Sequence, residues 1–273
     1  MTPEKRFCLI GHPVQGSLSP ALMEAAYHGR YAYDLIDEDR FETAFERAKE
    51  YDAFNVTAPY KVDAYKAALS HDRNSMGAEA CNLMVPTSKG GESGYLSYNT
   101  DVDGVANALK EGGYQHVGPF NDTALVVGAG GAAAAACIAL VGKLQHPVTV
   151  AGRNLEKARR LAERTALQSG EPVQGVHYTG LSPIELDPKM IRGVDVIVYT
   201  LPGSAPVPEG LPLGNAIVLE AEYKHPRLAD APCRQYVSGK LWLLHQAVSG
   251  FYQMTHEDPD VNAMREVLGL PRR

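Results

Sequence analysis

Long hydrophobic runs, closely spaced cysteines and an excess of positive charge are all missing from this sequence of 273 residues. Its longest run of small apolar residues, 132–141, is dominated by alanine and is too short to span a bilayer. Acidic residues outnumber basic ones by 32 to 26, for a net charge of −6, which argues against a nucleic-acid-binding surface. The start of the chain shows no signal-peptide pattern, so we expect a cytoplasmic protein.

Cysteines and histidines are too scattered to indicate a metal centre or a disulfide framework. The four cysteines are Cys8, Cys81, Cys137 and Cys233, and we expect them to be reduced thiols. The nine histidines form no pattern with carboxylates that suggests zinc. From this pattern we expect no metal. We also expect no nucleic-acid or membrane partner, a small-molecule substrate, and either a monomer or a homodimer.

A glycine-rich turn is the strongest feature that the sequence does contain. The turn lies between a predicted buried strand, 124–127, and an alanine-rich segment with high helix propensity. Gly128, Gly130 and Ala133 fit the G-x-G-x-x-G/A fingerprint of dinucleotide-binding folds, and a second apolar run follows at 148–151. The free N–H groups and dipole of the new helix favour a pyrophosphate there. The alternative is a glycine turn that binds no nucleotide. The cofactor contacts expected in the turn are Gly128, Ala129, Gly130, Gly131 and Ala132.

The end of the second strand predicts which cofactor binds. NAD sites usually have an acidic residue at this point, which accepts a hydrogen bond from the ribose 2′-hydroxyl. This chain instead has Arg153 and Asn154, with Lys157 one turn later. A guanidinium and a second cation suit a 2′-phosphate, so we predict NADP. The alternative for Arg153 is a solvated surface arginine.

The rest of the chain alternates predicted strands and helices, which indicates an α/β layer architecture. We expect strands at 7–10, 32–36, 53–61, 81–85, 95–98, 194–200 and 216–219, and helices at 21–28, 40–51, 62–69, 102–111, 240–254 and 258–268. The predicted fold has an N-terminal α/β substrate domain, 1–101, completed by helices from about 241–273. A doubly wound Rossmann-type NADP domain occupies 102–240, with the active site in the cleft between the two.

Polar side chains gather at the predicted strand ends of the first domain. Because ligands bind outside the carboxyl ends of strands in open α/β sheets, we expect these side chains to converge on a small polar ligand. They are Ser17, Ser19, Thr57, Lys61, Asn82, Asn99 and Asp101. Lys61 is suited to attract a carboxylate or to move a proton, with Asp101 orienting it. The alternatives are that Ser19 and Asp101 cap helices and that Lys61 is a solvated surface lysine.

Several motifs together resemble one family, in order from Gly11 to about Gln246. Ser17-Leu-Ser-Pro20 is similar to a Ser-x-Ser-Pro substrate loop, and Asn55-Val-Thr-Ala-Pro-Tyr-Lys61 to an Asn-Val-Thr-x-Pro-x-Lys catalytic stretch. Gly77-Ala-Glu-Ala-Cys-Asn82 resembles Gly-Ala-x-x-x-Asn, and Asn99-Thr-Asp101 the family's Asn-Thr-Asp. The family is that of the shikimate and quinate dehydrogenases.

The resemblance implies an enzyme: an NADP-dependent oxidoreductase that reversibly reduces 3-dehydroshikimate to shikimate in aromatic amino-acid biosynthesis. Lys61 and Asp101 would be its catalytic acid–base pair. Its substrate-binding residues would be Ser17, Ser19, Thr57, Asn82, Tyr223 and Gln246. Two alternatives remain: a dehydrogenase of quinate or a related cyclic polyol, and a homologue that binds ligand without turnover.

This sequence departs from the family pattern mainly in its second half. Gly16 stands where the family usually has His, and Gly152 replaces an Asn before Arg153. Tyr199-Thr-Leu201 replaces an Asn-Ala-Thr stretch that lines the cofactor, and 219–226 is a divergent Asp-x-x-Tyr-x-Pro motif. Trp242 takes the place of a methionine near the nicotinamide. The cofactor half therefore departs from the family pattern at more positions than the substrate half.

Overall fold

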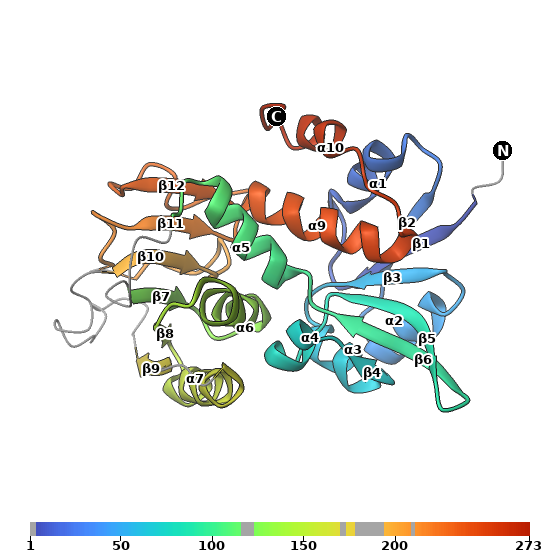
Figure 1. Ribbon diagram of the computed structural model, residues 1–273, viewed down its shortest axis with the longest axis horizontal. Coiled ribbons are helices and arrows are strands. Elements are labelled where there is room, and N and C mark those ends of the chain that lie inside the picture. The colour runs from blue at the N-terminus through green and yellow to red at the C-terminus, as the bar shows by residue number, and fades with distance from the viewer. Residues whose placement is uncertain (1–3, 116–122, 170–172, 178–193, 209–210) are drawn as a thin grey trace. The chain divides into compact units, whose positions relative to one another are not determined.

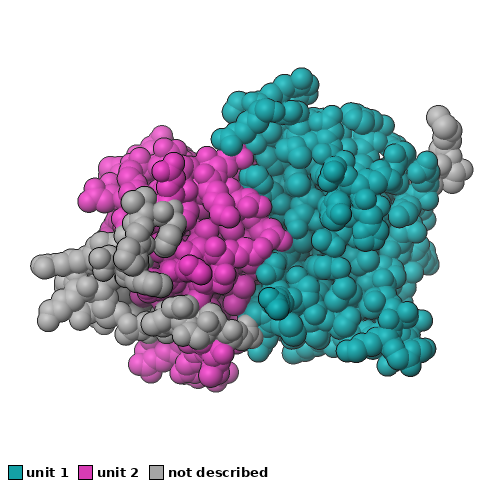
Figure 2. Space-filling model, in the orientation of Figure 1, with its two compact units in different colours: residues 1–100, 244–273 teal, residues 101–243 magenta. Residues whose placement is uncertain are grey.

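The computed structural model describes residues 4–115, 123–169, 173–177, 194–208 and 211–273 (Figure 1). The chain divides into two compact units (Figure 2). Unit 1 comprises residues 1–100 and 244–273, and unit 2 comprises residues 101–243. The chain enters unit 2 at the first residue of helix α5 (Asp101–Glu111) and returns to unit 1 within helix α9 (Gly239–Thr255).

Unit 1 is built on a mixed six-stranded sheet in the order β2-β1-β3-β5-β6-β4. Its strands are β1 (Arg6–Gly11), β2 (Ala32–Asp37), β3 (Ala53–Val56), β4 (Ser70–His71), β5 (Leu83–Lys89) and β6 (Glu92–Tyr98). β1 pairs parallel with both β2 and β3, whereas β5 runs antiparallel to its neighbours. Five of the six residues of β1 are buried, as expected for a central parallel strand.

Four helices of unit 1 contact the strands of this sheet: α1 (Ser19–Tyr27), α2 (Phe41–Ala48), α3 (Lys61–Ala67) and α4 (Arg73–Ala78). Unit 1 also contains part of α9, and α10 (Val261–Val267), which packs on α1. Ala44 and Ala48 of α2 are fully buried beside Ile10, Phe54 and Met84 of the strands. The same face of α2 adds two partly buried phenylalanines at positions 41 and 45, so the predicted helical stripe is confirmed.

Unit 2 contains a second six-stranded sheet, in which every strand is parallel to its neighbours. Its strands are β7 (Thr123–Val127), β8 (Val148–Gly152), β9 (Val173–His177), β10 (Val194–Tyr199), β11 (Ile217–Glu220) and β12 (Gln235–Ser238). Their spatial order is β12-β11-β10-β7-β8-β9, which is the Rossmann order of two βαβαβ halves. The predicted fold class, two α/β domains of which one is of the Rossmann type, is confirmed.

Helices of unit 2 lie where the βαβ pattern requires them. Helix α6 (Gly131–Ile138) packs on β7 and continues into a π-helical turn, η1 (Ala139–Lys143). Helix α7 (Leu155–Ser169) packs on β8 and β9. Within the described residues, no helix is both long enough and apolar enough to cross a membrane.

Three local predictions need correction. The predicted strand over 53–61 is β3 alone, because the chain turns after Val56 and begins α3 at Lys61. Ser19 does not cap α1 through its side chain: it is the first helical residue, Leu18 is the cap position, and Pro20 lies in the first turn. The elements β4, α4, α7, β9 and β12 were not predicted. Asp72 caps α4, with its carboxylate accepting from the Ser75 N–H at 2.6 Å.

Candidate functional site

The loop after β1 brings two predicted substrate residues together. The Ser17 hydroxyl donates to the Ser19 hydroxyl at 3.2 Å and accepts from the Ser19 N–H at 3.3 Å. Asp37 holds the start of this loop, accepting from the Val14 N–H at 3.2 Å and from His12 Nδ1 at 2.8 Å. The hydrogen bond from His12 is the main cause that lowers the pKa of Asp37 below its ordinary value. The Asp37 carboxylate therefore helps to fix the conformation of the loop that carries Ser17 and Ser19.

A chain of hydrogen bonds crosses the strand ends of unit 1, beginning at Tyr33. The Tyr33 hydroxyl lies near Ser19 and donates to Asn55 Oδ1 at 2.7 Å. The Asn55 amide donates in turn to the backbone carbonyl of Asn82 at 3.0 Å. Burial raises the pKa of Tyr33 well above its ordinary value, so the phenol remains a neutral donor.

The far end of this chain joins Asn82, Thr100 and Gln246. Asn82 Nδ2 donates to the Thr100 hydroxyl at 2.9 Å and to Gln246 Oε1 at 3.2 Å. Asn82 Oδ1 accepts from the Thr100 N–H at 2.8 Å. Asn82 and Thr100 are 4% and 2% exposed, and a buried amide with several partners keeps one orientation. Residues that are 164 positions apart thus become neighbours.

Thr57 and Lys61 follow β3 at the same end of the sheet. The Thr57 N–H donates to the Ile10 carbonyl at 2.9 Å, and a Cβ at Gly11 would lie only 2.4 Å from the Thr57 methyl. Only glycine therefore allows the two strand ends this close approach. Lys61 is half-buried and accepts from the Cys81 N–H at 2.9 Å through its carbonyl. Burial raises the pKa of the Cys81 thiol to about 12, while the nearby Lys61 charge opposes that rise.

Asp101 begins α5 in unit 2 and is almost fully buried. Its carboxylate Oδ1 accepts from the indole Nε1–H of Trp242 at 3.2 Å. Asp101 is 8% exposed and Trp242 is 5% exposed. Both Asp101 and Asp103 lie in the first turn of the helix, where the dipole favours a negative charge.

The glycine turn between β7 and α6 fits a phosphate group. Gly128 has φ +126°, and a Cβ there would lie 2.2 Å from the Thr200 hydroxyl, so this position requires glycine. A Cβ at Gly130 would meet nothing within 4 Å, which leaves the backbone at that point approachable. No described side chain caps the first turn of α6, so the N–H groups of that turn are available to an anion.

The tip of β8 lies beside this turn. A Cβ at Gly152 would be 3.5 Å from the Ala129 Cβ, which brings the residue before Arg153 next to the glycine turn. Asn154 Oδ1 accepts from the Lys157 N–H at 2.9 Å and so caps α7. Arg153 and Lys157 are both exposed, and the acid nearest to them in sequence pairs instead with Arg160 at 2.7 Å. The two cations at this tip suit a second phosphate.

Tyr223 lies on a loop that is held by hydrogen bonds to carboxylates. Glu220 is fully buried and accepts from the Arg227 N–H at 2.7 Å, the Leu228 N–H at 3.0 Å and the Tyr236 hydroxyl at 3.1 Å. The Arg227 guanidinium donates to the Gly203 carbonyl at 2.7 Å. The loop after β11 is therefore tied to the loop after β10. Burial raises the pKa of Tyr223, so its hydroxyl stays protonated near neutral pH.

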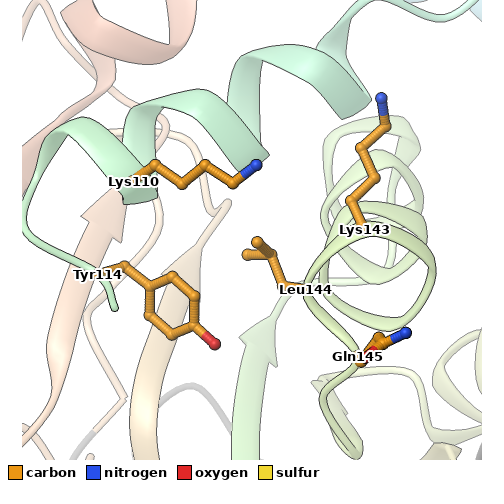
Figure 3. Close-up of a pocket in the computed structure, with 5 residues that line it drawn as sticks. All are labelled: Lys110, Tyr114, Lys143, Leu144 and Gln145. Atoms are coloured by element: carbon orange, nitrogen blue, oxygen red, sulfur yellow. The ribbon is translucent and has the colours of Figure 1, made fainter. Parts of the chain in front are cut away.

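Unit 2 also contains a cavity (Figure 3). It is lined by Lys110, Tyr114, Lys143, Leu144 and Gln145, and its volume is about 230 Å³. Lys143 is paired with Asp103, and the Tyr114 hydroxyl bonds His146. None of the predicted site residues lines this cavity.

The structure thus places four of the six predicted substrate residues in two hydrogen-bonded groups: Ser17 with Ser19, and Asn82 with Gln246. Sequence reasoning missed three other members, Tyr33, Asn55 and Thr100. Asn55 and Thr100 stand inside the quoted motifs, which was the available signal. Tyr33 stands in a strand with no motif, and no signal in the sequence distinguishes it.

Comparison with known proteins now identifies the family. The model of the shikimate dehydrogenase substrate-binding domain matches residues 9–84, and that of shikimate/quinate 5-dehydrogenase matches residues 115–201. The shikimate dehydrogenase (NADP(+)) of Methanopyrus kandleri is 31% identical over 280 residues, covering 95% of this chain and 93% of that relative. This chain belongs to the shikimate dehydrogenase family.

Solved structures of shikimate dehydrogenases share the fold along nearly the whole chain. That of Mycobacterium tuberculosis is 27% identical, with a TM-score of 0.78, and the match covers 97% of this chain and 99% of that one. The shikimate 5-dehydrogenase of Thermus thermophilus, solved in complex with NADP(H) and shikimate, is 26% identical, with a TM-score of 0.77 and 96% and 98% coverage. Family membership therefore extends over both units.

Proposed function

We propose that this protein is an NADP-dependent shikimate dehydrogenase, which reversibly reduces 3-dehydroshikimate to shikimate in aromatic amino-acid biosynthesis. The observation that carries the proposal is the set of hydrogen-bonded polar residues at the strand ends of unit 1. They are Ser17, Ser19, Tyr33, Asn55, Asn82, Thr100 and Gln246. A row of fixed hydroxyls and amides suits a small polyol, because each substrate hydroxyl both donates and accepts. The Thermus thermophilus relative was solved with shikimate.

In this proposal, the chain's own residues divide the work by chemistry. Ser17, Ser19, Thr57, Asn82, Tyr223 and Gln246 bind the substrate hydroxyls and carboxylate. The Lys61 ammonium gives a proton to the ring carbonyl oxygen during reduction and takes it back during oxidation. Asp101 orients the ammonium through its carboxylate. The domains would correspond to residues 1–101 with the C-terminal helices, which bind substrate, and 102–240, which bind cofactor.

The cofactor would be held by the glycine turn and the β8 tip. Gly128 to Ala132 would approach the pyrophosphate, and Arg153, Asn154 and Lys157 would contact the 2′-phosphate. NADP, when bound, supplies or accepts the hydride at the ring carbon. The Methanopyrus kandleri relative is named for NADP(+). We further propose a cytoplasmic monomer or homodimer, in keeping with its four free thiols.

The test is a spectrophotometric assay of purified protein with shikimate and NADP⁺. We expect NADPH to form, at a higher kcat/KM than with NAD⁺ or with quinate as substrate. A folded sample that forms no NADPH with shikimate at any pH between about 6 and 10 would refute the proposal. A higher kcat/KM for quinate than for shikimate would instead identify the protein as a quinate dehydrogenase. Shikimate binding without NADP binding would identify a non-catalytic homologue.

A further inference from the structure

Trp242 is the only tryptophan of the chain, and its indole contacts a proposed catalytic residue. The indole N–H donates to Asp101 Oδ1 at 3.2 Å, and both side chains are more than nine-tenths buried. Trp242 lies in the first turn of α9, and Asp101 is the first residue of α5. Both belong to unit 2, so this contact is internal to one compact unit.

We infer that Trp242 is a positioning residue, which fixes the carboxylate of Asp101 for proton transfer by Lys61. The inference rests on the proposed function, because it assigns Trp242 a role through Asp101. The backbone of Asp101 is held by α5, but a carboxylate can still rotate about its two side-chain torsions. A rigid indole that bonds Oδ1 selects one orientation and leaves Oδ2 aimed in one direction.

The chemistry of indole suits this task better than that of other donors. Indole N–H is a donor only, so it can neither take a proton from the carboxylate nor compete with it for the lysine. The ring is large and buried, so its position is set by packing rather than by the bond itself. Trp242 therefore orients Asp101 without entering the proton transfer.

The kinetic test removes the N–H and keeps an aromatic ring. In Trp242→Phe, we expect kcat for shikimate oxidation to fall about tenfold, the usual worth of one hydrogen bond to a charged group, while the shikimate KM changes by less than about threefold. In an Asp101→Asn background, Trp242→Phe should cause no further loss, because residues that act through one another share one effect. Equal losses in both backgrounds, or a rise in KM alone, would overturn the inference.

The matched control is Tyr252→Phe, which removes a polar group from an aromatic side chain on the same helix. Tyr252 is 44% exposed and has its ring contact with His256, so its kcat should match that of the native protein. A circular dichroism melt of each variant checks that it folds.

A second measurement needs no activity and separates the inference from the proposed function. Because Trp242 is the only tryptophan, the intrinsic tryptophan emission of the unliganded protein reports on this indole alone. Neutralising its acceptor in Asp101→Asn should shift the emission maximum, whereas Asp230→Asn, at an exposed position of the same unit, should not. An unchanged emission in Asp101→Asn would overturn the inference even in an active enzyme. A shift in a protein without dehydrogenase activity would sustain the contact and reject the proposed function.

Discussion

At the scale of single residues, Lys61 carries the sharpest prediction. Lys61→Ala should lower kcat for shikimate oxidation by about 10²–10⁴-fold, the usual worth of a positioned acid or base. The shikimate KM should change much less, because the hydroxyls and amides of Ser17, Ser19, Asn82 and Gln246 remain in place. Steady-state kinetics measure both parameters. Lys66→Ala is the control, since Lys66 is an exposed lysine on the same helix. A rise in KM with kcat intact would make Lys61 a binding group.

Arg153 carries a second residue-scale prediction, which concerns cofactor choice. Arg153→Ala should raise the KM for NADP⁺ by roughly 10- to 100-fold, because a charge-assisted bond to the 2′-phosphate is lost. The KM for NAD⁺, which lacks that phosphate, should stay nearly unchanged. Kinetics with the two cofactors give the ratio directly. Arg160→Ala is the control, since Arg160 is paired with Glu156. Equal rises for both cofactors would contradict a role in recognising the phosphate.

At the scale of secondary-structure elements, Gly239 at the start of α9 decides how closely that helix meets the end of β11. A Cβ at this position would lie 2.5 Å from the Ala221 carbonyl oxygen and 2.6 Å from the Glu220 carbonyl oxygen. Because both obstacles are backbone atoms, Gly239→Ala must displace the helix start and should cost about 1–3 kcal/mol of stability. Chemical denaturation measures the loss. Gly214→Ala is the control, since a Cβ there meets nothing within 4 Å.

Most of the elements that were predicted have a local signal, whereas the short strand β4 depends on a distant partner. The parallel strands β7 and β10 contain the apolar runs 124–127 and 196–199, and α2 shows its stripe in the spacing of its own residues. The two-residue strand β4 exists only because it pairs with β6, more than 20 positions later. The same reason explains the missed site residues: Tyr33 joins the polar chain through Asn55 on another strand. The buried Glu220 likewise acquires its role from residues 7 to 16 positions further on.

At the scale of the whole molecule, acid should destabilise the fold partly through the loop that carries Ser17. The hydrogen bond from His12 lowers the pKa of Asp37 from an ordinary value of 3.8, so the folded state favours the ionised carboxylate. The stabilisation from such a group is present above the unfolded-state pKa and is lost as the pH falls through the lower folded-state value. The urea concentration at the unfolding midpoint should therefore decrease as the pH falls below about 4, because the Asp37 carboxylate then becomes protonated.

The variant Asp37→Asn isolates this contribution from the other carboxylates of an acidic protein. At neutral pH it should unfold at a lower urea concentration than the native protein, because His12 and the Val14 N–H lose a charged acceptor. The difference should shrink as the pH falls below about 4, since the native carboxylate is then neutral too. The control Asp230→Asn, at an exposed aspartate of unit 2, should parallel the native curve at every pH. A gap between Asp37→Asn and the native protein that stays constant down to about pH 2.5 would show that Asp37 acts through packing rather than through its charge.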